Sequence, residues 1–161
     1  MHLAAVLFQS RAGIQLNHVP YKGGTAGPVA LLANEIPLLF STAAGVTNYV
    51  ETGRLRALAV TTQKRFALWP DVPTIAETVL PGFDVLAWYA VAAPKNMPAP
   101  LVNRLNGVVH AATERRDVSE KLLTLGAEVR TTSAREAQDF LAAEVARWTK
   151  VVRDENIPPQ N

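Results

Sequence analysis

Apolar residues follow two alternating patterns along the first half of the chain. Leu3, Val6 and Leu7 have helical spacing, and Gly13 is placed to end that helix. Short apolar runs of strand type alternate with further helical stretches. Such alternation is typical of βαβ units and predicts an α/β domain with a mostly parallel sheet. The pattern predicts strands at 14–19, 36–40 and 55–61. It also predicts a helix that follows a turn at 21–25 and ends near Asn34, and a helix from about Thr42 to just before Gly53.

The second half of the chain is mainly helical in pattern. Thr74 with Glu77, and Ser133 with Glu136, have the spacing of capping boxes and predict the first turns of two helices. A long β-type run occupies 83–93, and the boundary between two parts of the chain is expected between about Pro81 and Pro94. The remaining predictions are helices opening at Pro98 and at Asp117, a short strand at 127–131, and apolar helix faces carrying Leu105, Val109, Phe140, Leu141 and Trp148.

Composition narrows the range of functions. The 161 residues carry 19% charged side chains and a net charge of +2, with acids and bases interspersed. This balance does not favour nucleic acid or an anionic membrane as partner. Because the chain lacks cysteine, a disulfide, a thiolate metal site and a cysteine nucleophile are excluded. There is no apolar run of the about 20 residues that span a membrane, so no membrane insertion is expected.

The segment Tyr21-Lys22-Gly23-Gly24-Thr25 lies where a predicted strand passes into a predicted helix. Glycines let a backbone approach a ligand closely, and N–H groups at the start of a helix attract anions. Lys22 adds positive charge. The same glycines also fit an ordinary turn, and the spacing is not that of a phosphate-binding loop.

A second such junction is Ser41-Thr42-Ala43. A hydroxyl at this position is most often a plain N-cap, but it can also hold a ligand beside the helix. Ligands of parallel sheets bind at the carboxyl ends of strands, where both junctions are predicted to lie. The two turns together therefore favour a site for an anion.

Catalytic chemistry finds little support in the sequence. His2, His18 and His110 have no metal-ligand spacing and are interpreted as isolated histidines. No serine lies in a G-x-S-x-G elbow, and no pair of carboxylates suggests acid–base catalysis. We therefore expect no catalytic residue, no metal site and no cofactor.

Several motifs in this order resemble the Bug family of extracytoplasmic solute-binding proteins, the TctC-like receptors of tripartite tricarboxylate transporters. The resemblance runs from about His2 to Ile157. The segments that carry it include 18–24 (HVPYKGG), 53–61 (GRLRALAVT), 70–77 (PDVPTIAE), 81–83 (PGF), 88–89 (WY), 125–127 (LGA) and 148–152 (WTKVV).

The resemblance implies a fold of the type II periplasmic-binding-protein kind, with a small carboxylate held between two lobes by amides, water and hydroxyls. Residues 1–83 would be the second, ligand-binding lobe, incomplete at its start, and 84–161 the crossover strand and helical return segment of the first lobe. The implied partners are the carboxylate and the membrane subunits of the transporter. Matching positions imply ligand contacts from Tyr21, Lys22, Gly23, Gly24, Thr25, Ser41, Thr42 and Ala43.

Departures from the family pattern qualify these expectations. The family carries a signal peptide and a first lobe ahead of the segment matching His2, so the resemblance implies an N-terminally truncated chain. The full-length protein would be periplasmic, whereas the chain as written would stay in the cytoplasm. Where the family often has an acid, this chain has Ser41, which disfavours an amino-acid ligand because its ammonium needs a counter-charge. Two other readings stay open: a small α/β hydrolase acting on a carboxylate, and a periplasmic sensing module of a two-component system.

Overall fold

The computed structural model describes residues 1–155 and 157, which form two compact units. The first unit comprises Met1–Ala87 together with Thr124–Gly126, and the second comprises Trp88–Leu123 and the chain from Ala127 onward. The change of unit after Ala87 falls inside the boundary range that the sequence pattern marks. The assignment of these units to the two lobes of a binding protein stays a prediction.

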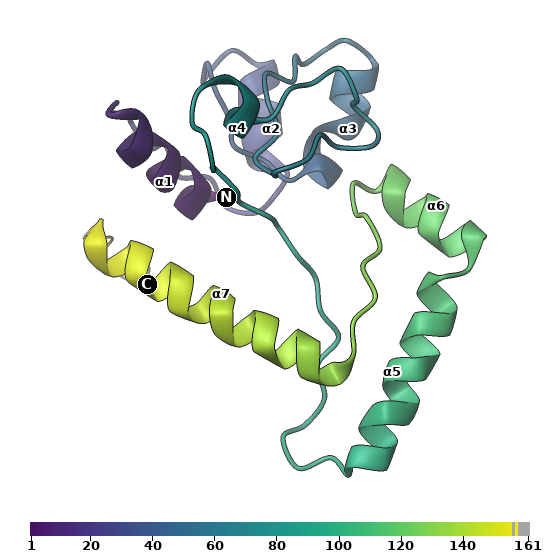
Figure 1. The fold of residues 1–161 in the computed structure, drawn as a ribbon. Coiled ribbons are helices and arrows are strands. Elements are labelled where there is room, and N and C mark those ends of the chain that lie inside the picture. Colours follow the sequence, from purple (N-terminus) through teal and green to yellow (C-terminus); the bar gives the residue numbers. More distant parts are fainter. Residues whose placement is uncertain (156, 158–161) are drawn as a thin grey trace. The chain divides into compact units, whose positions relative to one another are not determined.

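Four helices belong to the first unit: α1 (His2–Ala12), α2 (Ala26–Leu32), α3 (Ala43–Glu51) and α4 (Ile75–Thr78) (Figure 1). The predicted stop signals are confirmed, since Gly13 caps the end of α1 with φ 65° and Gly53 follows α3 with φ 70°. The Phe8 ring on α1 packs against the rings of Phe40 and Phe83, with centroids 5.7 and 6.1 Å apart. This aromatic cluster is part of the core of the unit, because Phe83 is fully buried.

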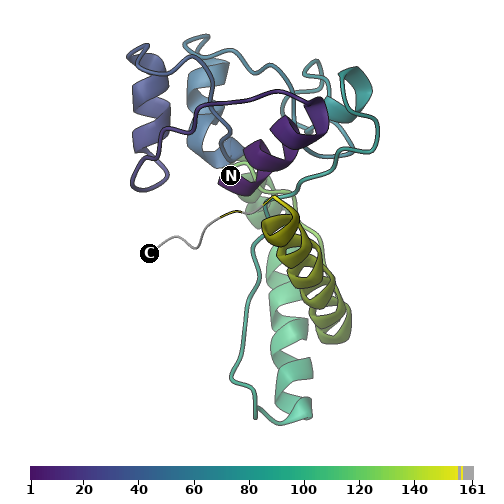
Figure 2. The ribbon, with the colours of Figure 1, turned by 90° about the vertical axis from the view of Figure 1, so that its left-hand side faces the viewer.

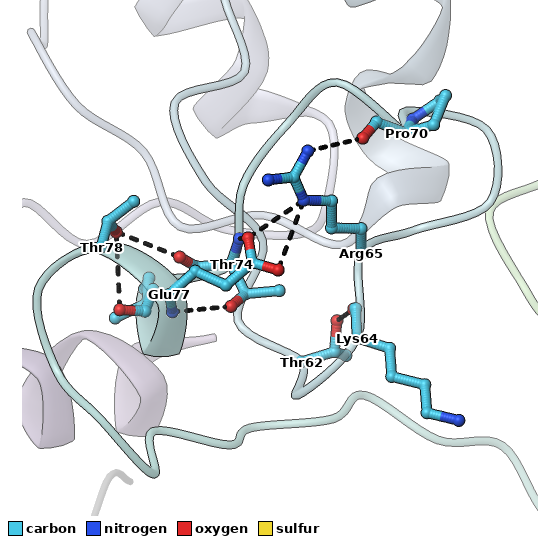
Figure 3. Close-up of polar contacts among 8 residues, drawn as sticks. Thr62, Lys64, Arg65, Pro70, Thr74, Glu77 and Thr78 are labelled. Carbon is cyan, nitrogen blue, oxygen red and sulfur yellow. Dashed lines mark hydrogen bonds and ion pairs between the residues drawn. The ribbon is translucent and has the colours of Figure 1, made fainter.

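The predicted capping box at α4 is confirmed (Figure 3). The Glu77 N–H donates to Thr74 Oγ1 at 3.0 Å, and the Thr74 N–H donates to Glu77 Oε2 at 3.0 Å. Arg65 donates to the same carboxylate at 3.0 Å and to the Pro70 carbonyl at 3.0 Å. The pKa of Glu77 therefore lies below its usual value, mainly because the Thr74 N–H stabilises the ionised form, with a further contribution from Arg65.

The predicted strands are wrong as regular elements in the part of the chain that the structure describes. There, only Val60 and Thr74 form a parallel bridge. The Val60 N–H donates to Pro73 O and the Ile75 N–H to Val60 O, each at 2.9 Å, while the Val85 N–H donates to Thr61 O at 2.8 Å. An apolar run favours extended backbone, but a strand also needs successive hydrogen bonds from a neighbour. Where Val60 and Thr61 meet the segments around Thr74 and Val85, each contact extends over only one or two residues.

The second unit contains α5 (Ala99–Thr113), most of α6 (Arg116–Thr124) and α7 (Ala134–Asp154), which Figure 2 shows in a second view. The capping box of Ser133 and Glu136 at the start of α7 is confirmed. Glu144 on α7 accepts the indole N–H groups of Trp88 at 3.4 Å and Trp148 at 3.0 Å. This carboxylate ties the extended start of the unit to α7.

The apolar faces that the sequence predicts on α5 and α7 are partly exposed. Leu105 is 42% exposed, and Phe140 and Leu141 are 36% and 46% exposed. Val109 and Trp148 on the same helices are half-buried. The predicted helical spacing is confirmed by both helices, and it places these residues on common faces without specifying what covers them.

Candidate functional site

The first candidate turn, residues 21–25, lies just before α2. Lys22, Gly23, Gly24 and Thr25 are exposed, and Tyr21 is half-buried. Gly23 has φ 80°, a conformation that favours glycine. A Cβ placed on either Gly23 or Gly24 would meet no atom within 4 Å, so space lies beside this backbone. Since α2 has only seven residues, the turn itself is the more important source of N–H donors.

The second candidate turn, Ser41-Thr42-Ala43, leads into α3. Thr42 has extended backbone at the N-cap position (φ −73°, ψ 150°), but its side chain makes no cap hydrogen bond. The turn is closed by the backbone instead, where the Gly45 N–H donates to Thr42 O at 3.0 Å. Thr42 therefore occupies the N-cap position, but the interpretation of its hydroxyl as a plain N-cap is wrong, because the hydroxyl makes no cap hydrogen bond to α3. All three residues are half-buried.

The two turns approach one another at Gly45, the third residue of α3. A Cβ placed on Gly45 would lie 3.0 Å from Ser41 Oγ, 3.7 Å from the Gly24 carbonyl oxygen and 3.7 Å from Thr42 Oγ1. Residues about twenty positions apart thus direct polar atoms to one point. Apart from the residues next to Gly45 and the nearby backbone of α3 itself, these three atoms are the nearest to that point.

Sequence reasoning missed Gly45 as part of the site. Its signal was weak: glycine is disfavoured inside a helix, and here it stands one turn after two hydroxyl residues. The hydroxyls of Ser41 and Thr42 can donate to a carboxylate, and the Lys22 ammonium can add charge to the same region. The Gly24 carbonyl can accept only, which suits a ligand hydroxyl or a bridging water. The arrangement can therefore hold a polar anion.

The histidines differ from their sequence interpretation as isolated residues. The His2 and His18 rings stack, with centroids 4.1 Å apart and planes at 13°. The pKa of His2 is lowered, first by burial and then by the neighbouring His18 and the chain's N-terminal charge. His110 Nε2 lies 2.7 Å from the Thr132 carbonyl oxygen. Within residues 1–155 and 157, the structure has no cluster of three or more histidine or acidic side chains that could hold a metal ion.

Solved structures share the backbone arrangement of this chain. The R. palustris protein Rpa4515 with adipate is 34% identical with a TM-score of 0.88, and 99% of this chain covers 53% of that one. Periplasmic binding protein BugD is 30% identical with a TM-score of 0.84, over 99% of this chain and 54% of that chain. MatC from Rhodopseudomonas palustris with bound malate is 29% identical with a TM-score of 0.79, over 94% and 52%. The fold class is that of the Bug-type periplasmic binding proteins, as the sequence resemblance implies.

The family follows from the sequence itself. The model of the tripartite tricarboxylate transporter family receptor matches residues 1–157, and the chain belongs to this family. One relative, the UPF0065 protein in the tcbD-tcbE intergenic region of Pseudomonas sp. (strain P51), is 37% identical over 153 residues, which is 94% of this chain and 46% of that protein. The chain thus spans about half the length of such curated relatives. Among the described residues, no helix combines the length and apolar character that crossing a membrane requires.

Proposed function

We propose that this chain takes part in capturing a small carboxylate for a tripartite tricarboxylate-type transporter, as part of an extracytoplasmic receptor. The observation that carries the proposal is the convergence of Gly24, Ser41 and Thr42 at Gly45. Membership of the receptor family supports it, as do the solved relatives described with adipate and with malate. In this proposal the chain is not an enzyme, its working location is the periplasm, and its protein partners are the membrane subunits of the transporter.

The proposed contacts divide by chemistry. Ser41 and Thr42 donate hydroxyl hydrogen bonds, and the turn 21–25 donates backbone N–H groups whose surroundings are open at Gly23 and Gly24. Lys22 contributes charge from an exposed position, where screening by water limits its effect. Hydrogen bonds to a charged group are stronger than neutral ones. We therefore assign most of the affinity to the amides and hydroxyls and less to Lys22.

A calorimetric titration with adipate and with adipamide tests the proposal. Both compounds have the same carbon chain, but only adipate is charged, so we expect binding of adipate alone. Thr42→Val removes one hydroxyl with little change of shape and should weaken adipate binding by roughly tenfold. Thr52→Val is the matched control, because Thr52 lies at the other end of α3 and bonds the Asn48 carbonyl.

Equal binding of adipate and adipamide, or loss of affinity in both threonine variants, would refute the proposed site. Proton NMR after incubation tests for turnover. Adipate that is recovered unchanged shows that the chain binds it without converting it. A hydrolysed carboxylate ester or amide in a parallel incubation would instead favour the hydrolase alternative.

The side chain at position 41 bears on the kind of carboxylate. Serine offers no negative charge to an α-ammonium group, whose burial without a counter-charge is costly. We therefore expect malate to bind more tightly than aspartate, which differs from it only by the ammonium in place of the hydroxyl. Ser41→Asp should reduce or reverse that preference, and tight binding of aspartate by the unmodified chain would contradict this part of the proposal.

A further inference from the structure

Residues 124–126 belong to a different compact unit from the residues on either side of them. The helices before and after them belong largely to the second unit, yet Thr124–Gly126 belongs to the first. The Ala127 N–H donates to the Leu122 carbonyl at 2.9 Å, and Gly126 has φ 81°. This is the hydrogen bond and left-handed glycine of a Schellman helix end. The end of α6 thus accounts for the left-handed backbone of Gly126.

A separate feature of Gly126 is how closely it lies against α3. A Cβ at this position would be 2.5 Å from the Ala44 nitrogen, 2.8 Å from Ala43 Cβ and 2.9 Å from the Ala43 carbonyl carbon. All three distances are shorter than Cβ atoms tolerate, and two involve backbone atoms that cannot rotate away. By contrast, a Cβ on Gly13, Gly53 or Gly82, which share the positive φ, would meet no atom within 4 Å. Only a residue without a side chain permits this contact.

We propose that Gly126 is a positioning residue for the carboxylate site. Its backbone packs directly on the Ala43–Ala44 peptide and so fixes the first turn of α3, where Thr42 and Gly45 lie. A side chain at position 126 must move either residues 124–126 or this first turn, and the hydroxyls of Ser41 and Thr42 move with the turn. This inference rests on the proposed function of the same site.

The experiment compares Gly126→Asn with Gly53→Asn. Asparagine adopts the left-handed conformation more readily than other residues with a Cβ, so both variants carry similar, modest backbone strain. Only the first introduces atoms against α3. We expect Gly126→Asn to raise the adipate Kd by about tenfold, the loss of one hydrogen bond to a charged group, and Gly53→Asn to leave it within about twofold.

Amide hydrogen exchange without ligand provides an independent measurement. Exchange at Ala43, Ala44 and Gly45 should accelerate in Gly126→Asn and stay unchanged in Gly53→Asn. If Gly126→Asn does not fold, the alanine pair Gly126→Ala and Gly53→Ala repeats the comparison with a smaller side chain.

Equal effects of the two variants on Kd, or unchanged exchange at Ala43–Gly45 in Gly126→Asn, would overturn the positioning role. If the unmodified chain binds neither adipate nor malate, the proposed function fails by itself. The exchange data still decide in that case whether Gly126 holds the first turn of α3, and equal exchange in the two variants overturns that as well.

Discussion

Replacing Gly45 by alanine should separate ligand binding from stability. Glycine inside a helix is less favourable than alanine by roughly 0.5–1 kcal/mol, so Gly45→Ala gains that amount from the helix. The new methyl lies 3.0 Å from Ser41 Oγ, and turning that hydroxyl aside costs about 0.5–1.5 kcal/mol. The two terms nearly cancel. We therefore expect the melting temperature to change by no more than about 2–4 °C.

The effect of Gly45→Ala on affinity should be much larger. The methyl occupies the point on which Ser41, Thr42 and the Gly24 carbonyl converge, at 3.0–3.7 Å from each polar atom. Turning one hydroxyl away from a carboxylate removes a hydrogen bond to a charged group, worth about 1.5–3 kcal/mol. The adipate Kd should therefore rise roughly ten- to hundredfold, as measured by isothermal titration calorimetry.

Gly107→Ala is the matched control for this prediction. Gly107 lies inside α5, and a Cβ there would meet no atom within 4 Å. It should gain the same helix preference and bind adipate as the unmodified chain does. An unchanged Kd in Gly45→Ala, or a Kd that rises equally in Gly107→Ala, would show that the convergence at Gly45 is not where the ligand binds.

Three further predictions concern stability. Thr74→Val keeps the shape of a fully buried residue but removes the cap of α4, so urea unfolding should show a loss of about 1–2 kcal/mol, whereas Thr74→Ser should retain the cap. Glu144→Leu leaves the indole N–H groups of Trp88 and Trp148 without their acceptor. Because the Trp88 bond is exposed to water, the change should cost about 0.5–1.5 kcal/mol, with a smaller cost for Glu144→Gln. The lowered pKa of His2 means that the unfolded chain takes up the proton first, so the free energy of unfolding should fall as the pH drops below 6.5. His2→Gln should flatten this dependence below pH 6.5.

Helix ends were the most predictable part of the structure. Gly13 after α1, Gly53 after α3 and the capping boxes at Thr74 and Ser133 all lie where the sequence predicts them. Each of these signals acts within four or five residues, so the information is contained in the segment itself.

Strands were less predictable because their hydrogen bonds come from elsewhere in the chain. The run 83–93 has a strong β pattern, yet Val85 is 4% exposed while Val91 is 82% exposed. Val85 donates to the Thr61 carbonyl and accepts from the Thr61 hydroxyl. Apolar residues occur along the whole run, but only the part beside Thr61 has the backbone of a neighbouring segment to bond to, and only that part is buried.

The candidate site shows the same division between local and distant information. Its two turns could be proposed from glycines and hydroxyls beside predicted helix starts. Their meeting at Gly45, and the approach of Gly126 to the same helix, depend on residues about 20 and 80 positions apart. A glycine signals freedom of the backbone or close approach of another group, and the sequence does not say which atoms approach.

Gly45 and Gly126 have different roles at the first turn of α3. Measurements of adipate affinity and of amide hydrogen exchange together distinguish these roles. Gly45 leaves space beside Ser41 and Thr42, whereas Gly126 brings a second backbone against Ala43 and Ala44. Filling the space at Gly45 should weaken adipate binding without accelerating amide exchange in the helix, because alanine strengthens the helix. A side chain at Gly126 should weaken binding and accelerate exchange together, because the turn that carries the hydroxyls is displaced. Only a site formed by this turn produces both patterns.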